Sequence, residues 1–474
     1  MPVFRFVYPQ RVALEGEEIM EAILDSLNNI LWGPPTMALL FIVGLYFSYK
    51  TRLFQLRHIG HILKNTLGKI LTKQAHGGDS EGTMTPFQAL STALAGTVGN
   101  ANMAGVAAAI VVGGPGAVFW MWVIAFFGML TKLVEVSLAV QYRQKAEDGT
   151  FFGGPMYYIE KGLGAQWKPM AIFFSLMMMV GALGTAVFVQ PATMASAMDN
   201  LFGIPPVVTV VTTVLVCGLV IFGGFKSVGR FCERITPTMC LLYTVFAIGV
   251  LIVNAANIPA ALGLIFKYAF EPMPVMGGLA GSTIAAAIQR GVARGTFSNE
   301  AGMGSAPMVH ATAKTEHPVM QGLYGACEVF IDTMIICTMT ALVILTSGME
   351  IWASGVTGID LTLLSFSNIY GGLGKGVVGC CVLLFALSTM IGYCVEFETS
   401  VAYIFGVKYM KFFRIIYLIP PFLTLGHPTN VIWTVVDICV AVVVIPNVIA
   451  LFLLRKEFLR VFEDYKQKYM GAKR

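Results

Sequence analysis

The chain has 474 residues, of which 56% are hydrophobic and 12% are charged, and its formal net charge is +5. Soluble globular proteins carry about a quarter of their residues as charges, so the composition excludes an ordinary soluble protein. The basic residues lie in short loops between hydrophobic segments, which argues against nucleic-acid binding. Apolar stretches of about 18 or more residues, each able to cross a hydrocarbon core of about 30 Å, predict an all-α polytopic membrane protein.

The predicted elements begin with an N-terminal segment, residues 1–33, whose short acidic helix we expect at the membrane interface on the extracytoplasmic side. The first membrane-spanning helix is predicted at 34–50. Further apolar segments bring the total to about eleven spans, and they lie at 85–112, 115–141, 169–198, 205–224, 235–255, 276–309, 318–347, 373–405, 412–426 and 430–454. Residues 455–474 form a basic tail.

Loop charge gives the predicted spans an orientation. The loops after the first, third, fifth, seventh and ninth spans are basic, and so is the tail after the last span. Membrane proteins concentrate Lys and Arg in their cytoplasmic loops. The sequence therefore predicts a multi-pass protein of the cell membrane, with its N-terminus outside and its C-terminus in the cytoplasm.

The span at 85–112 is interrupted by the stretch GTVGNANMAG, residues 96–105. With a rise of about 1.5 Å per residue, this stretch lies near the bilayer midplane. Glycine disfavours a helix, and Thr97, Asn100 and Asn102 would be costly against lipid. Small residues also let two helices pack closely, so the glycines alone fit either interpretation. The asparagines and the threonine favour a broken helix that lines a polar site.

A second interruption, RGTFSNEAGMGSAP at 294–307, lies in the span at 276–309. The spans after the first form two sets of five, 85–255 and 276–454, and because five is odd the second set must enter the membrane from the opposite side. Each set begins with a glycine-interrupted polar helix. This pattern predicts an inverted-repeat secondary transporter whose site lies at the midplane between two broken helices.

The chemistry of the breaks suggests the cargo. An unwound helix exposes N–H groups suited to a carboxylate at one end and carbonyls suited to Na⁺ at the other. A zwitterionic amino acid with a cation fits this arrangement better than a sugar or an inorganic anion.

Ionisable groups at membrane depth are functional candidates by default. Glu300, inside the second break, could hold the substrate ammonium, help bind the cation or bond the unwound backbone. Arg290 and Arg294 lie one helical turn apart just before the break, where a gate salt bridge and simple pairing with Glu300 or Asp332 are both open. For Asp332 itself, a structural pair is the preferred interpretation.

Several long motifs resemble the alanine or glycine:cation symporter family. They are GGPGAVFWMWVIAFFG (113–128), GGPMYYIEKGLG (153–164), GTFSNEAGMGSAPMVHATAKTEHP (295–318), VFIDTMIICTMTALVIL (329–345) and VVDICVAVVVIPNVIALFLL (435–454). The resemblance implies a LeuT-type 5+5 inverted repeat preceded by one extra helix. It also implies uptake of alanine or glycine driven by Na⁺, less often by H⁺, with glutamine as the substrate of some members.

The first break departs from the family pattern, which commonly reads GTVGTGNIAGVA. Here Asn100, Ala101 and Met103 stand where the family has Thr, Gly and Ile. The longer Asn100 side chain and the Ala101 methyl group lie where a substrate carboxylate would approach. The substrate therefore stays open among small neutral amino acids, with glutamine or serine as alternatives to alanine and glycine.

The resemblance also implies substrate contacts. The carboxylate would meet the amides of Asn100 and Ala101, beside Gly99. Phe297 could close over the substrate as a gate or simply pack in the membrane. Gln190 could reach the amino group or bond the carbonyls that Pro191 frees.

Two sodium sites follow from the same resemblance. Asn102 would be a ligand of the sodium nearest the substrate, with the Thr97 carbonyl and Ser298. A second sodium would lie between the carbonyls around Ala95 and Val98 and hydroxyls of the ninth span, Ser388 and Thr389. Such hydroxyls also commonly bond their own helix backbone.

Two other classes of protein fit less well. A channel would need polar stripes along several helices, whereas polarity is concentrated at two breaks. An enzyme would need a nucleophile with a base, or a metal motif, and neither pattern is present. The nine cysteines show no metal-ligand spacing. Proton coupling through Glu300 is the closer competitor to sodium coupling.

Overall fold

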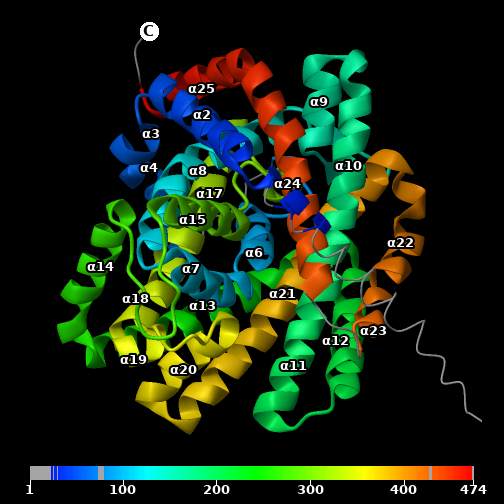
Figure 1. Cartoon of the computed structure of the whole chain (residues 1–474). Coiled ribbons are helices and arrows are strands. Elements are labelled where there is room, and N and C mark those ends of the chain that lie inside the picture. The colour runs from blue at the N-terminus through cyan, green and yellow to red at the C-terminus, as the bar shows by residue number, and fades with distance from the viewer. Residues whose placement is uncertain (1–22, 25, 29, 73–79, 426–429, 472–474) are drawn as a thin grey trace, which may run out of the picture.

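The computed structural model describes residues 23–24, 26–28, 30–72, 80–425 and 430–471. Residues 1–22, which hold most of the predicted interfacial helix, lie outside this part of the chain. Almost all of the described chain is helical, with one two-stranded antiparallel sheet between β1 (Gln144–Lys145) and β2 (Phe151–Phe152). Figure 1 shows the helices bundled side by side, with further short helices across both ends.

The helices of the first half are α2 (Pro34–Lys50), α3 (Phe54–Arg57), α4 (Ile59–Leu63), η1 (Lys64–Gly68), α5 (Lys69–Leu71), α6 (Pro86–Thr97), η2 (Ala101–Gly105), α7 (Val106–Gly113), α8 (Gly116–Gln141), α9 (Pro155–Leu163), η3 (Ala165–Trp167), α10 (Lys168–Ala182), η4 (Leu183–Val189), α11 (Gln190–Phe202), α12 (Pro206–Ile221) and α13 (Gly224–Val253).

Those of the second half are η5 (Ala255–Asn257), α14 (Ile258–Phe270), α15 (Ile284–Asn299), α16 (Ala306–His310), α17 (Pro318–Val329), η6 (Phe330–Cys337), α18 (Thr338–Thr346), α19 (Met349–Trp352), α20 (Gly358–Tyr370), α21 (Gly372–Ile404), η7 (Val407–Tyr409), α22 (Met410–Tyr417), α23 (Pro420–Leu423), α24 (Asn430–Leu453) and α25 (Arg455–Tyr469).

Length and composition identify five helices in the described chain that can each cross a membrane: Gly116–Gln141, Ala165–Phe202, Gly224–Val253, Pro318–Thr346 and Gly372–Ile404. Two bent pairs raise the number to seven. Pro86–Thr97 with Ala101–Gly113 is bent by 50°, and Ile438–Leu453 with Arg455–Tyr469 by 64°. The multi-pass helical class is therefore confirmed, and the count of about eleven stays a prediction.

Two predicted spans differ from the structure. The segment 412–426 is not one helix but α22 and α23, which are separated at Leu418 and Ile419. Pro420 and Pro421 follow directly, and a proline disfavours helical backbone at the residue before it. The segment 276–309 becomes helical only at Ile284, since Met273 and Met276 form β-bridges with Ser282 and Leu279 ahead of it.

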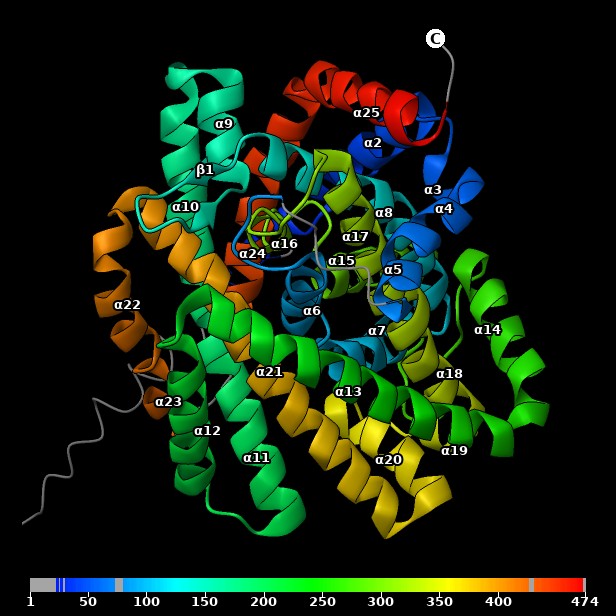
Figure 2. The same cartoon turned by 180° about the vertical axis from the view of Figure 1, so that it is seen from behind.

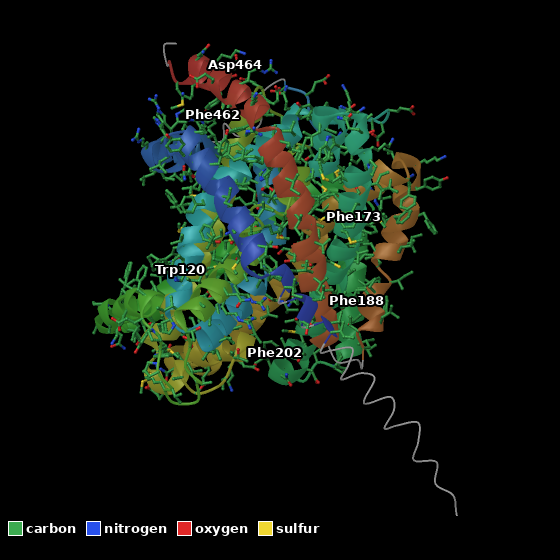
Figure 3. All side chains as sticks on the ribbon, turned by 45° about the horizontal axis from the view of Figure 1, so that its top comes forward. Trp120, Phe173, Phe188, Phe202, Phe462 and Asp464 are labelled. Atoms are coloured by element: carbon green, nitrogen blue, oxygen red, sulfur yellow. The ribbon has the colours of Figure 1, made fainter. Side chains whose placement is uncertain are left out.

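The centre of the bundle is α8, which packs against α15 and α17. Figure 2 shows α13 and α21 crossing near α6 on the opposite side from α2. Large apolar side chains on the outer helices are exposed, as expected for a surface that meets lipid. Phe173 on α10 and Phe202 on α11 are examples in Figure 3, with 45% and 48% of their surfaces exposed.

The tail forms a helix that the sequence did not predict. Phe458, Phe462 and Tyr465 of α25 are buried, and the Phe47 and Phe54 rings pack edge-on against the two phenylalanines. The opposite face carries ion pairs between neighbouring charges. Figures 1 and 2 show α25 lying across the same end of the bundle as α3 and α4.

Candidate functional site

The first break separates α6 from η2 and α7. Thr85 caps α6 with a reciprocal pair of hydrogen bonds to Gln88, so the helix has a defined start. Its end is set at Val98, whose backbone is extended (φ −80°, ψ 91°). A Cβ atom on Gly99 would lie 2.9 Å from the Thr389 Oγ1 atom, so only glycine allows α21 this close to the turn.

The second break follows α15. Glu300 caps the helix in the left-handed region with φ +56°, and Gly302 and Gly304 also have positive φ. The chain becomes helical again only at α16. Glu135 of α8 accepts a hydrogen bond from the Gly302 N–H at 3.1 Å, and Asn447 of α24 donates to the Gly302 carbonyl at 2.8 Å. Polar side chains of two other helices therefore hold the unwound backbone, as buried peptide groups require.

The two breaks meet at one polar cluster. The Asn102 Nδ2 atom donates to Ser298 Oγ at 3.1 Å and to Asp332 Oδ1 at 2.6 Å. Ser298 Oγ donates to Asp332 Oδ2 at 2.8 Å. Thr333 donates to the same carboxylate at 2.8 Å, and the Cys337 sulfur lies 3.2 Å from Ser298 Oγ. All of these residues are buried. Their side-chain oxygen atoms lie close together where α15, η2 and η6 converge.

Asn102 also shapes its own break. Its Oδ1 atom accepts the Gly99 N–H at 2.8 Å, and an amide oxygen has a second lone pair for another partner. Asn102 and Ser298 are predicted from the sequence to share a sodium ion, and the structure brings the two together. Asp332, for which a structural pair is the preferred interpretation, joins them, and so do Thr333 and Cys337, which are not among the predicted site residues. The sequence feature that could have indicated this role is the position of Asp332, an acidic residue in the motif VFIDT within an apolar span.

Glu300 is engaged by two hydroxyl groups. Its carboxylate accepts hydrogen bonds from Tyr393 of α21 and from Ser305. Within the described chain, no ion pair links Glu300 or Asp332 to Arg290 or Arg294. The Arg294 guanidinium instead lies 5.8 Å from the centre of the Phe297 ring. Glu300 thus ties the second break to α21.

The predicted second sodium site is only partly assembled. Thr389 lies against Gly99, next to the end of α6 that carries Ala95 and Val98. Its hydroxyl bonds the Phe385 carbonyl at 2.8 Å, and Ser388 donates to the same carbonyl at 2.9 Å while contacting Met239 of α13. The Thr97 hydroxyl likewise bonds the Ala93 carbonyl, at 3.3 Å. The Ser388 and Thr389 hydroxyls thus bond their own helix, which is the alternative stated for them from the sequence, and the Thr97 hydroxyl does the same on α6.

A cavity of about 460 Å³ opens beside the first break. It is lined by Asn100, Ala101, Ala104, Gly105, Ala108, Thr193, Arg294, Phe297, Thr357, Gly358 and Ile359. Gln190 is not among the residues that line this cavity, but its Oε1 atom accepts a hydrogen bond from Asn100 Nδ2 at 3.1 Å. The predicted substrate contacts Asn100, Ala101 and Phe297 therefore share one cavity.

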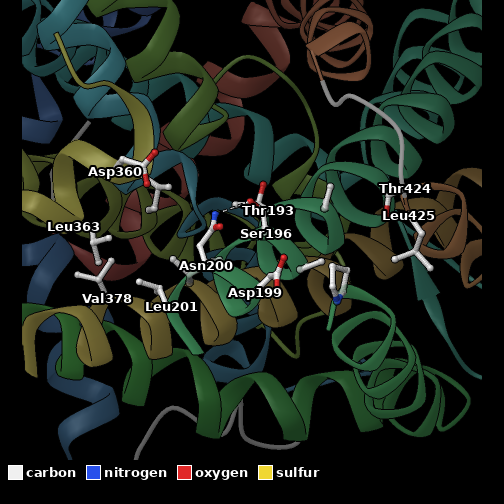
Figure 4. Close-up of a pocket in the computed structure, with 16 residues that line it drawn as sticks. Thr193, Ser196, Asp199, Asn200, Leu201, Asp360, Leu363, Val378, Thr424 and Leu425 are labelled. Carbon is white, nitrogen blue, oxygen red and sulfur yellow. Dashed lines mark hydrogen bonds between the residues drawn. The ribbon is translucent and has the colours of Figure 1, made fainter. Parts of the chain in front are cut away.

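A larger cavity, of about 540 Å³, lies next to the first, since Thr193 and Ile359 line both. Figure 4 shows its polar residues, among them Ser196, Asp199 and Asn200 of α11 and Asp360 of α20. These side chains are exposed. The two cavities lead from the first break toward the end of the bundle formed by α11 and α20 in Figure 1.

Comparison with known proteins places the chain among transporters. The profile of the sodium:alanine symporter family matches residues 17–474. An uncharacterized transporter of Haemophilus influenzae is 39% identical over 95% of this chain and 97% of its own. The sodium/alanine symporter AgcS of Methanococcus maripaludis is 37% identical over 91% and 94%, and the probable sodium/glutamine symporter GlnT of Bacillus subtilis is 36% identical over 96% and 93%.

Among solved structures, a mutant of the manganese transporter of Eremococcus coleocola has a similar fold. Its TM-score is 0.52 with 12% sequence identity, over 80% of this chain and 78% of the transporter. At this identity the likeness concerns the fold alone.

Proposed function

Because the chain belongs to the sodium:alanine symporter family, we propose that it is a secondary active transporter that carries a small neutral amino acid into the cell together with Na⁺. Alanine or glycine is the proposed cargo, and alternating access across the cell membrane is the proposed mechanism. The observation that carries the proposal is the meeting of the two broken helices, where Asn102 and Ser298 contact each other and Asp332.

The cavity beside the first break provides the proposed amino-acid site. In the described chain, the N–H groups of Asn100 and Ala101 have no hydrogen-bond acceptor, which suits a substrate carboxylate. Phe297 lines the same cavity and is the proposed gate, with Arg294 against its ring. Gln190 acts through Asn100, and Glu300 holds the second break through Tyr393.

The oxygen cluster provides the proposed sodium site nearest the substrate. Na⁺ prefers oxygen ligands, and Ser298 Oγ and Asp332 supply hydroxyl and carboxylate oxygens. The Thr97 carbonyl and Asn102 Oδ1 are the further proposed ligands, and Asn102 would have to turn its amide, since Nδ2 now faces Ser298 and Asp332. Asp332 would balance the charge of the cation at this depth. For the second sodium we propose the carbonyls of Ala95 and Val98 with Thr389 and Ser388, which requires both hydroxyls to turn away from the Phe385 carbonyl.

The orientation and the repeats belong to the same proposal. We propose that residues 85–255 and 276–454 form two inverted sets of five helices. Each set begins with a broken helix, and the extra helix α2 precedes both. The segment 50–64, which includes α3 and α4 and carries Lys50, Arg52, Arg57 and Lys64, lies at the same end of the bundle as the basic helix α25, which supports a cytoplasmic C-terminus. The cavities reach toward the opposite end, so the described conformation would receive substrate from outside.

Uptake by purified protein in liposomes tests the proposal. Labelled alanine should accumulate against its gradient when Na⁺ is higher outside, and not when Na⁺ is equal on both sides. Glycine, alanine, serine and glutamine are then added as competitors. Passive equilibration in both conditions would indicate a channel, and accumulation that none of the four amino acids inhibits would refute the substrate assignment.

Proton coupling is the second candidate. One observation favours it: Glu396 of α21 is buried, and its Oε2 atom has no hydrogen-bond partner in the described chain. A buried carboxylate with an unsatisfied oxygen is costly when charged, so a proton on that oxygen would lower the cost. Uptake driven by a pH gradient in Na⁺-free buffer, and lost in Glu300→Gln or Glu396→Gln, would establish this candidate instead of sodium coupling.

A further inference from the structure

The side chain of Asn100 ends in an oxygen atom with no partner. Asn100 has 1% of its surface exposed, and its Nδ2 atom is used by Gln190 at 3.1 Å. Its Oδ1 atom is buried and accepts no hydrogen bond from any described residue. Because a buried acceptor left unsatisfied costs free energy, this oxygen is poised for a donor that the chain does not supply.

The oxygen belongs to a residue that lines the cavity of about 460 Å³. The neighbouring wall is built from small side chains of η2 and α7, namely Ala101, Ala104, Gly105 and Ala108. None of these side chains can donate or accept a hydrogen bond. The Asn100 amide is therefore the polar side chain of this wall, while Thr193, Arg294 and Thr357 line the other sides of the cavity.

Other groups are proposed for the two ends of a bound amino acid. The N–H groups of Asn100 and Ala101 suit the carboxylate, as proposed above. The carbonyls at the end of α15 suit the ammonium, because those of Ser298 and Asn299 receive no backbone N–H in the described chain. The Asn100 oxygen is then left to face the third substituent of the amino acid, its side chain.

We propose that Asn100 is a specificity-determining residue that selects neutral amino acids whose side chains donate a hydrogen bond. Serine is the smallest member of this class, and threonine, asparagine and glutamine are larger ones. Gln190 is a positioning residue, because it holds Nδ2 of Asn100 and so fixes the orientation of the amide. The inference rests on the proposed Na⁺-coupled uptake of a small neutral amino acid, and within that class it favours serine over alanine and glycine.

The test compares two amino acids of the same size. Serine and L-2-aminobutyrate differ by a hydroxyl in place of a methyl group, so their ratio as competitors of labelled serine uptake isolates the hydrogen bond. In proteoliposomes with an inward Na⁺ gradient, serine should inhibit at about tenfold lower concentration than 2-aminobutyrate, as expected for one net hydrogen bond. Asn100→Leu, with a side chain of similar size, should bring the two concentrations together.

Two further variants complete the design. Asn254→Leu is the matched control, since Asn254 at the end of α13 also has an unpartnered amide atom but lies outside the cavity lining. It should keep the tenfold ratio. Gln190→Met should reduce the ratio through the freed Asn100 amide while uptake of 2-aminobutyrate persists.

The outcomes separate this inference from the function on which it rests. Absence of Na⁺-dependent uptake of any amino acid would refute the proposed function. Na⁺-dependent uptake with equal inhibition by serine and 2-aminobutyrate in the unaltered chain would overturn the inference alone. Equal weakening of both competitors in Asn100→Leu would also overturn it, because Oδ1 would then bind the ammonium. The ratio in the unaltered chain decides the matter even if a variant fails to fold.

Discussion

The Asn102 Nδ2 atom lies 2.6 Å from the Asp332 Oδ1 atom, across 230 residues of sequence. This contact joins the first broken helix to η6 at the point where Ser298 of the second broken helix also bonds the carboxylate. Residues from three separate segments, η2, α15 and η6, therefore meet at one buried carboxylate. Asp332 is therefore the residue that links the two broken helices.

Asp332→Asn should impair transport strongly. The carboxylate accepts hydrogen bonds from Asn102, Ser298 and Thr333, and an amide would place a donor against one of them. We expect uptake to fall by about tenfold or more, with a higher Na⁺ concentration for half-maximal rate. Asp148→Asn is the control, because its side chain only accepts the Thr150 N–H in an exposed loop and asparagine can do the same. Unchanged Na⁺ dependence in Asp332→Asn would contradict the proposed role.

Gly99→Ala should disturb the first break by crowding alone. The added Cβ atom would lie 2.9 Å from Thr389 Oγ1, closer than carbon and oxygen tolerate, so α6 and α21 must separate. We expect a lower melting temperature and slower uptake. Gly263→Ala on α14 adds the same methyl group where no atom lies within 4 Å, and it should be neutral or stabilising. Equal melting temperatures for the two variants would show that the turn at Gly99 can relax.

The buried ion pair of Lys132 and Glu328 predicts an asymmetric response to mutation. Their charged atoms lie 3.3 Å apart, both side chains are fully buried, and His310 contacts the same carboxylate at 2.9 Å. Lys132→Met leaves the carboxylate without its cation and should cost about 3–5 kcal/mol of folding stability. The double variant Lys132→Met with Glu328→Gln should recover much of this loss in thermal unfolding. A double variant less stable than the single one would contradict this reasoning.

Docking of α25 should weaken in acid. The rings of His61 and His317 pack against Tyr465, and burial is the main cause that lowers the pKa of each histidine below its usual range. For His317 the nearby Asp464 opposes this shift without reversing it. Because the undocked histidines bind protons more readily, docking is favoured above their ordinary pKa of about 6.5 and is lost as the pH falls below it.

Limited proteolysis of the α24–α25 junction between about pH 7.5 and 5 measures this effect. Cleavage should accelerate as the pH falls, and the acceleration should shrink in His317→Asn, which can still accept a hydrogen bond at the start of α17. Cleavage that is independent of pH in the unaltered chain would contradict the prediction.

Both breaks could be predicted because glycine and polar residues act locally on helix stability. The chain leaves the helix at Val98 and at Glu300, inside the two predicted stretches. What the sequence could not supply is contact between distant segments. The roles of Asp332 and Tyr393 depend on how η6 and α21 pack against the breaks, and no local pattern encodes that packing.

Helix ends were harder to predict where hydropathy and backbone chemistry disagree. The segment 412–426 is apolar enough for one span, yet Pro420 and Pro421 divide it. The tail was predicted from its charge alone, although Phe458, Phe462 and Tyr465 follow a helical spacing that buries them on one side of α25. Composition averaged over a stretch of sequence does not show that the apolar residues lie on one side of a helix.

The measurement that tests the shared site most directly is a double-mutant cycle on Asn102 and Ser298. The Na⁺ concentration for half-maximal amino-acid uptake is determined in proteoliposomes for the unaltered chain, Asn102→Ala, Ser298→Ala and the double variant. Two ligands of one cation should give strongly non-additive effects, with the double variant little worse than either single one. Uptake that does not require Na⁺, or two shifts that simply add, would contradict a single sodium site built from both broken helices.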